Sequence, residues 1–183
     1  MKNNLVFTKK DELMIKKIIN AFNSYENKGI ALEVISNSLD PIMLGSPIIN
    51  INTDVNLNVT INASFKNNII SGSITIIHKF DENDIETLIE FSNRMNKNYG
   101  SVGYLVFDQI NRILVMRFAV ELVDGKIDTD RLLSCFDIAF NNATNNFRFL
   151  ENTDISGCDS GKLFLKYLDF RNNQDKFNNR ELN

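Results

Sequence analysis

Histidine and cysteine, two residue types that often carry catalysis or bind metals, are rare in this chain of 183 residues, which has one histidine, His78, and two cysteines, Cys135 and Cys158. A zinc site needs several ligands at close spacing, and no second ligand stands beside His78. A general base at His78 would need an acid folded against it, such as Asp81 or Asp108. We therefore expect no metal, no cofactor and no enzymatic activity.

Other short motifs lead to the same expectation. The acidic run DENDIE, residues 81–86, lacks the glycine and the twelve-residue spacing of a calcium loop. The stretch GSVG, residues 100–103, lacks the lysine of a phosphate loop and precedes a strand pattern. Cys135 falls in an apolar helical pattern and is interpreted as a core residue. Cys158 lies in the loop SGCDSG, and whether its thiol is reactive stays open.

Composition excludes two classes of partner. The formal net charge is −3, and lysines cluster only at residues 9–17, at the start of a predicted helix. A nucleic-acid-binding protein usually shows a basic stripe, so we expect no nucleic-acid partner. No stretch approaches the roughly 18 apolar residues of a membrane span, and the N-terminus does not read as a signal peptide. These features predict a cytoplasmic protein without a membrane partner.

Hydrophobic periodicity predicts an α+β fold. Apolar residues at spacings of three and four indicate three helices, and period-two alternation indicates about five strands. The order α-β-β-β-α-β-β-α predicts a mainly antiparallel sheet with helices on one face. Both prolines, Pro41 and Pro47, fall in residues 37–53, which we interpret as a long connection with room for a short turn of helix or strand. The predicted helices run from residue 8, over 81–99 and over 128–150, with Thr8, Asp81 and Asp128 as their caps. The predicted strands are 30–36, 55–65, 69–79, 102–107 and 112–120.

We place the domain in residues 1–150. Residues 151–183 read as a linker, a short apolar segment at 163–170 of uncertain type and a disordered polar tail.

The predicted strands differ in their second faces. In 55–65 an apolar residue alternates with an uncharged polar one, so that one face of this strand is exposed to water. Strands 102–107 and 112–120 are apolar on both faces, which is typical of strands covered on both sides. The cover would be the apolar loop 42–51, the segment 163–170 or another protein chain.

Residues 74–150 show a sequence pattern that is similar to that of a known protein family. Two asparagines three apart, Asn93 and Asn96, stand at the end of the central predicted helix. A hairpin with a polar turn at 108–111 follows, and a long closing helix begins at Asp128. This stretch resembles the YbjN family and, more broadly, the fold of type III secretion chaperones. The resemblance implies a non-enzymatic protein-binding domain, often a homodimer.

The leading hypothesis is a chaperone-like or regulatory domain that buries an apolar client or a dimer surface on its sheet and helices. The alternative is an immunity-type or inhibitory protein that blocks one dedicated partner, and the third reading is an enzyme of unknown reaction. For Asn93 and Asn96 a purely local role, bonding backbone groups near a helix end, is favoured over partner contact. The residues assigned to partner binding are Leu114, Met116, Phe118, Tyr104, Asn93 and Asn96.

Overall fold

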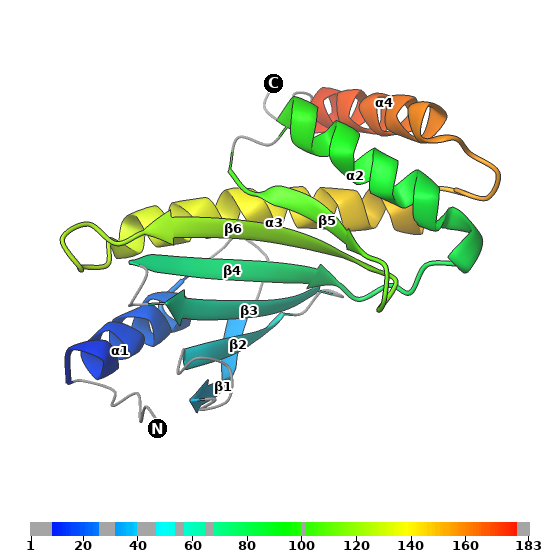
Figure 1. Ribbon diagram of the computed structural model, residues 1–183. Helices are drawn as coiled ribbons and strands as arrows, with labels where there is room; N and C mark the ends of the chain where they lie inside the picture. The colour runs from blue at the N-terminus through cyan, green and yellow to red at the C-terminus, as the bar shows by residue number, and fades with distance from the viewer. Residues whose placement is uncertain are drawn as a thin grey trace.

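The fold is a six-stranded sheet with helices, seen here in a computed structural model that describes residues 9–25, 32–39, 47–53, 57–64, 68–99 and 102–178 (Figure 1). The α+β class is confirmed. The helices are α1 (Lys9–Asn23), α2 (Ile85–Tyr99, preceded by the 3-10 turn η2, Glu82–Asp84), α3 (Thr129–Glu151) and α4 (Ser160–Asn178). The strands are β1 (Leu32–Leu39), β2 (Pro47–Thr53), β3 (Leu57–Ser64), β4 (Ile69–Ile76), β5 (Tyr104–Asp108) and β6 (Ile113–Glu121).

All neighbouring strands are antiparallel, in the order β1-β2-β3-β4-β6-β5. The turn from β3 to β4 includes Asn68 at a positive φ of 54°, a conformation that asparagine tolerates. Asp81 caps η2 by accepting the Asn83 N–H, and Asp128 caps α3 by accepting the Arg131 N–H. Both caps were predicted from the sequence.

The predicted connection over residues 37–53 was wrong, because β1 continues to Leu39 and residues 47–53 form β2. The sheet therefore has six strands rather than five. Pro47 is the first residue of β2, a position at which a missing N–H costs little. Pro41, the predicted helix cap Thr8 and both ends of the predicted strand 55–65 lie outside the described residues.

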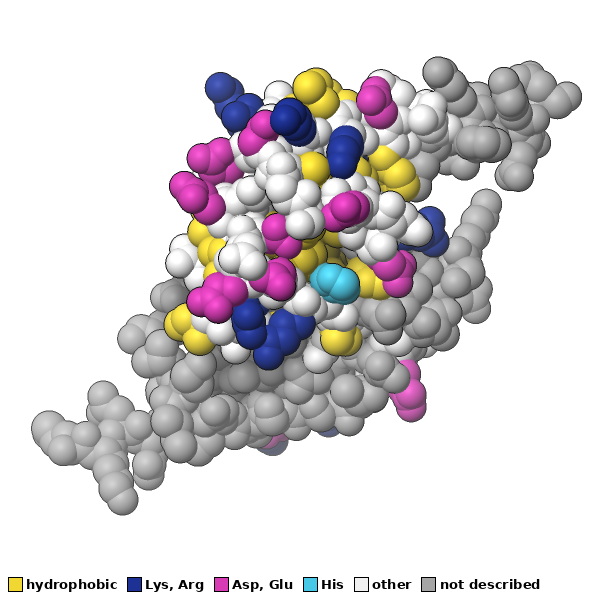
Figure 2. Space-filling model, turned by 90° about the vertical axis from the view of Figure 1, so that its right-hand side faces the viewer, with side chains coloured by type: hydrophobic (Ala, Val, Ile, Leu, Met, Phe, Trp, Pro, Cys, Tyr) yellow, Lys and Arg dark blue, Asp and Glu magenta, His cyan; other side chains and the backbone are white. Residues whose placement is uncertain are grey.

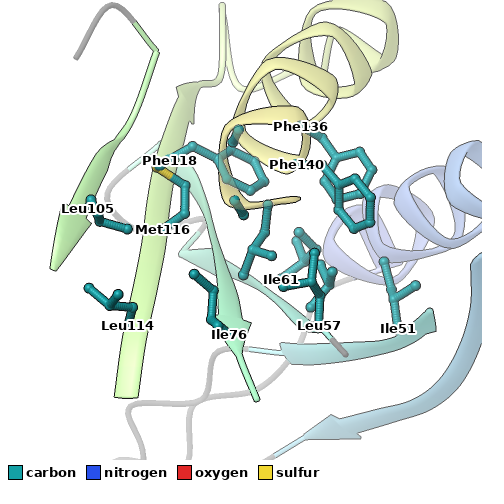
Figure 3. Close-up of a cluster of buried hydrophobic side chains, with 14 of the residues drawn as sticks. Ile51, Leu57, Ile61, Ile76, Leu105, Leu114, Met116, Phe118, Phe136 and Phe140 are labelled. Carbon is teal, nitrogen blue, oxygen red and sulfur yellow. The ribbon is translucent and has the colours of Figure 1, made fainter. Parts of the chain in front are cut away.

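One face of the sheet forms the core. Side chains on β4 alternate between partly buried and buried along the whole strand, and those on β3 follow the same period. Strand side chains such as Ile61 and Ile76 lie on the side of the sheet on which Phe136 and Phe140 of α3 pack (Figure 3). The ring of Phe118 on β6 lies 6.2 Å from that of Phe136, centroid to centroid.

A glycine makes room for this aromatic contact. Gly72 on β4 stands opposite Phe118 in the β4–β6 register. A Cβ atom at Gly72 would lie 2.1 Å from Cζ of the Phe118 ring, far inside van der Waals contact. The Phe118 ring therefore packs directly on the backbone of β4 at Gly72, where there is no side chain.

The helix α1 packs beside α3. The rings of Phe22 and Phe136 meet edge to face at 5.0 Å. The Tyr25 hydroxyl donates to Oδ1 of Asp137 at 2.6 Å. Burial, together with this hydrogen bond, holds the pKa of Tyr25 well above its usual range.

After residue 150 the predicted linker is found as turns over 152–159, whereas the disordered tail was wrong as far as residue 178. Residues 160–178 form α4, which packs on α2, where we expected a short apolar segment and a disordered tail. Leu163 and Tyr167 of α4 are completely buried in the same core cluster as the sheet. The Ser160 hydroxyl donates to Glu90 on α2 at 2.5 Å, and Thr87 donates to the Cys158 carbonyl at 3.0 Å. The domain boundary at residue 150 itself stays a prediction.

Replacing Gly72 with alanine is expected to lower the free energy of unfolding by about 1–3 kcal/mol, because the new methyl group overlaps the Phe118 ring. Chemical denaturation measures this value. Ser73→Ala, the next residue on the same strand but facing away from the core, should stay within about 0.5 kcal/mol of the wild type. In a Phe118→Leu background the cost of Gly72→Ala should shrink, and an equal cost in both backgrounds would contradict the overlap.

Tyr167→Ala is expected to lower the free energy of unfolding by about 3–5 kcal/mol, because its buried ring touches aromatic rings of both α2 and α3. Leu165→Ala is the matched control, since Leu165 is on the same helix but 61% exposed. If the two variants melted alike, α4 would not be part of the cooperative core.

Candidate functional site

The sheet face opposite the core is built from uncharged polar residues on β3 and β4. Their register places Asn58 opposite Thr75, Thr60 opposite Ser73, and Asn62 opposite Ser71. Apart from the exposed Asn58, these side chains are partly buried. The buried side chains of both strands point to the other side, toward the helices. Within the described ranges no helix lies over this surface.

The same face turns apolar on β5 and β6. Tyr104 is 50% exposed, and Val106 and Val115 stand opposite each other in the register. Arg117 lies between Ser73 and Tyr104 and is the one charged residue in the middle of this part of the sheet. We call the whole surface the open face: Asn58, Thr60, Asn62, Ser71, Ser73, Thr75, Tyr104, Val106, Ile113, Val115, Arg117 and Ala119.

Of the covers expected for this face, the segment 163–170 and the described part of the loop 42–51 are not found on it. Residues 47–51 belong to β2, a strand of the sheet, and residues 163–170 belong to α4, on the helix side. Residues 42–46 of the apolar loop lie outside the described residues. The apolar second faces of β5 and β6 are instead partly exposed, with Val115 buried among its neighbours in the sheet.

Three predicted partner-binding residues lie in the core. Leu114, Met116 and Phe118 are 0%, 5% and 2% exposed and point toward the helix layer (Figure 3). A partner cannot reach them in the folded chain, so this assignment is corrected: they hold the sheet to the helices. Tyr104, in contrast, lies on the open face.

Asn96 bonds the backbone of an edge strand. Its Nδ2 donates to the Leu105 carbonyl at 2.8 Å, and its Oδ1 accepts the Leu105 N–H at 2.6 Å. Because β5 is the last strand of the sheet, these two bonds replace those that a further strand would make there. Asn93 is exposed on α2, one turn away. The favoured local role therefore fits Asn96, although the bonded backbone belongs to β5 rather than to its own helix.

A cleft of about 490 Å³ opens where α2 ends beside α3 and α4. Its lining residues come from these three helices and carry amide, aromatic and basic groups: Asn96, Lys97, Asn98, Tyr99, Ile138, Asn142 and Arg171. The Arg171 guanidinium lies 5.5 Å from the centre of the Tyr99 ring. The volume falls in the range of about 300–1,000 Å³ that is usual for small-molecule sites.

A smaller cavity of about 10 Å³ adjoins this cleft and shares Asn96, Tyr99 and Asn142 with it. Asn146 also lines this inner cavity and is completely buried. Its Nδ2 donates to the Asn142 carbonyl at 2.7 Å, whereas its Oδ1 accepts no hydrogen bond from any described group. A buried amide oxygen without a donor is unfavourable unless a bound molecule supplies one.

Sequence reasoning missed Asn142 and Asn146 of α3 as lining residues, although one signal was available for Asn146. Ala139, Ala143 and Leu150 define the buried stripe of this helix, and Asn146 falls in the same stripe. A polar residue in a buried helical stripe needs a partner.

The candidate catalytic groups do not converge. His78 is exposed and packs on the ring of Phe80, and Figure 2 shows the histidine among separated acidic and basic side chains. Neither the cleft nor the inner cavity is lined by His78, Asp81 or Asp108. Hydrogen bonds from Asn111 lower the pKa of Asp108, which closes the β5–β6 turn. Among the described residues no group of three or more His, Cys, Asp or Glu side chains could hold a metal ion.

The two cysteines differ in their surroundings. Cys135 is half-buried on α3 and packs against the core, in agreement with its interpretation as a core residue. Cys158 is half-buried too, and Nζ of Lys166 lies 3.3 Å from its Sγ.

Comparisons with protein-family models, with curated proteins and with solved structures find no match to this chain. In the part of the chain that the structure describes, no helix combines the length and the apolar character that crossing a membrane requires.

Asn96→Ala is expected to lower the free energy of unfolding by about 1–3 kcal/mol, because Leu105 loses both side-chain hydrogen bonds at the edge of the sheet. Asn93→Ala provides the control on the same helix and should change it by no more than about 0.5 kcal/mol. Denaturant titration of both variants measures the difference. Equal stability of the two variants would show that the Asn96 bonds do not hold β5.

Proposed function

We propose that the protein is a non-enzymatic protein-binding domain that works as a homodimer, with the open face as the contact between the two copies. The observation that carries this proposal is the character of that face. It is the second side of a sheet whose first side is already filled by helices, and its residues on β3 to β6 are mainly uncharged polar or apolar.

Charge favours a second copy as the occupant. In a two-fold dimer the same patch meets itself, so any strong charge in its middle would face a like charge. The open face keeps this repulsion small, because Arg117 is the one charged residue in its middle, while Asp108 and Glu121 lie on the same side at the ends of β5 and β6. The chain as a whole carries a net charge of −3, with 43 charged residues, so this depletion is local.

The size of the sheet also suits such a contact. The four strands β3 to β6, of about eight residues each, cover an area of about 19 Å by 26 Å, or about 500 Å², before the side chains at the rim are added. A stable interface of standard size buries about 800 Å² on each partner.

The resemblance of residues 74–150 to the YbjN family and the type III secretion chaperones points in the same direction. Proteins of that superfamily bind other proteins and often form homodimers. A chaperone-like function would then use surfaces of the dimer to hold a client protein.

Thr75→Lys tests the proposal, because it adds a positive charge to the middle of the open face, where the two copies would bring like charges together. Light scattering after gel filtration should give the mass of two chains for the wild type and of one chain for Thr75→Lys. Circular dichroism checks that the variant is folded.

Asn141→Lys is the matched control, since it makes a lysine of an exposed residue on α3, away from the open face. This variant should keep the mass of the dimer. A wild-type protein that stays monomeric at high concentration, or a Thr75→Lys protein that stays dimeric, would overturn the proposal. A wild-type monomer that gains mass only with a different added protein would assign the open face to a client instead.

A further inference from the structure

The buried amide of Asn146 needs a hydrogen-bond donor that no described residue supplies. Its Nδ2 is used by the Asn142 carbonyl at 2.7 Å, which leaves Oδ1 as the unpaired atom. Asn146 is 0% exposed, so bulk water does not reach it. A group that enters the inner cavity beside it can satisfy this atom.

The inner cavity restricts what that group can be. Its volume of about 10 Å³ is close to the roughly 10–15 Å³ that one water molecule requires. Its walls include the apolar side chains of Met95, Leu105 and Met116, and none of its lining residues is charged. An ammonium group would be costly there without a carboxylate, whereas a hydroxyl group matches both the size and the unpaired acceptor.

The outer cleft has the opposite electrostatic character. Lys97 and Arg171 line it, and none of the described residues that line it is acidic. The Arg171 guanidinium lies 5.5 Å from the centre of the Tyr99 ring and 3.5 Å from the Tyr167 hydroxyl, contacts that orient it on α4. Two positive side chains beside amide donors favour an anionic group, such as a phosphate or a carboxylate.

We propose that this cleft binds a small anion that carries a hydroxyl group. The hydroxyl group enters the inner cavity and donates to Oδ1 of Asn146, and the anionic group lies at the cleft rim near Lys97 and Arg171. Phosphorylated polyols and hydroxy acids share this chemistry. The site is on the helix side of the molecule, so it is separate from the open face and does not depend on the proposed dimer.

Calorimetric titration of the full-length protein tests the site with glycerol 3-phosphate and ribose 5-phosphate as polyol phosphates and gluconate as a hydroxy acid. We expect at least one of them to bind saturably with a dissociation constant in the millimolar range or below. Inorganic phosphate and glycerol each lack one of the two groups and should bind at least tenfold more weakly. Tighter binding of the polyol phosphates would identify the anionic group as a phosphate, and tighter binding of gluconate would identify it as a carboxylate.

Asn146→Leu removes the unpaired acceptor and fills the inner cavity, so it should weaken binding at least tenfold. It should change the melting temperature little, because the lost hydrogen bond from Nδ2 to the Asn142 carbonyl is offset by removing a buried amide oxygen that has no donor. Asn141→Leu is the matched control on the exposed side of α3 and should bind like the wild type. Lys97→Gln, a change of an exposed residue, should also weaken binding and tests the site even if Asn146→Leu does not fold.

Three results would overturn the inference. One is that none of the three probes binds at millimolar concentration, which would leave the inner cavity to a water molecule. Another is that inorganic phosphate or glycerol alone binds as tightly as the combined molecules. The third is that the folded variants Asn146→Leu and Lys97→Gln bind like the wild type.

Discussion

The aromatic contacts of α3 are the interaction on which the rest of the structure depends. Near its middle, Phe136 touches Phe22 of α1 and Phe118 of β6. Near its C-terminal end, Phe149 touches Phe91 of α2 and Tyr167 of α4. One helix of 23 residues thus joins the sheet and all three other helices. Its position determines which face of the sheet is closed, because the side chains of each strand alternate between the two faces.

That arrangement leaves two surfaces of different character. The open face is an extended, mainly uncharged sheet surface, which suits contact with another protein chain. The cleft beside α2, α3 and α4 is small, amide-lined and basic at its rim, which suits a small molecule. Both lie where they do because the described helices gather on one side of the sheet: none of them covers the open face, and their packing leaves a small cavity beside the buried Asn146.

Two asparagines show how burial gives the same residue type different roles. Both the nitrogen and the oxygen of the Asn96 amide form hydrogen bonds with the backbone of Leu105, at the edge of the sheet. Only the amide nitrogen of Asn146 forms a hydrogen bond, to the Asn142 carbonyl, and the residue lines a cavity of the size of one water molecule. The first amide is satisfied by the fold and stabilises it. The second is not, so it is the one that can contribute to binding.

The sequence by itself determined the α+β class, the strands β3 to β6, the helices α2 and α3, and the caps Asp81 and Asp128. Periodicity and capping are local properties, so the amino-acid order is sufficient to read them. It did not determine β2, which begins at a proline, or α4, whose apolar residues find their partners on α2 and α3. Only the tertiary structure decided that Leu114 and its neighbours on β6 are core and that Asn146 lies at a cavity, because burial depends on segments far apart in the chain.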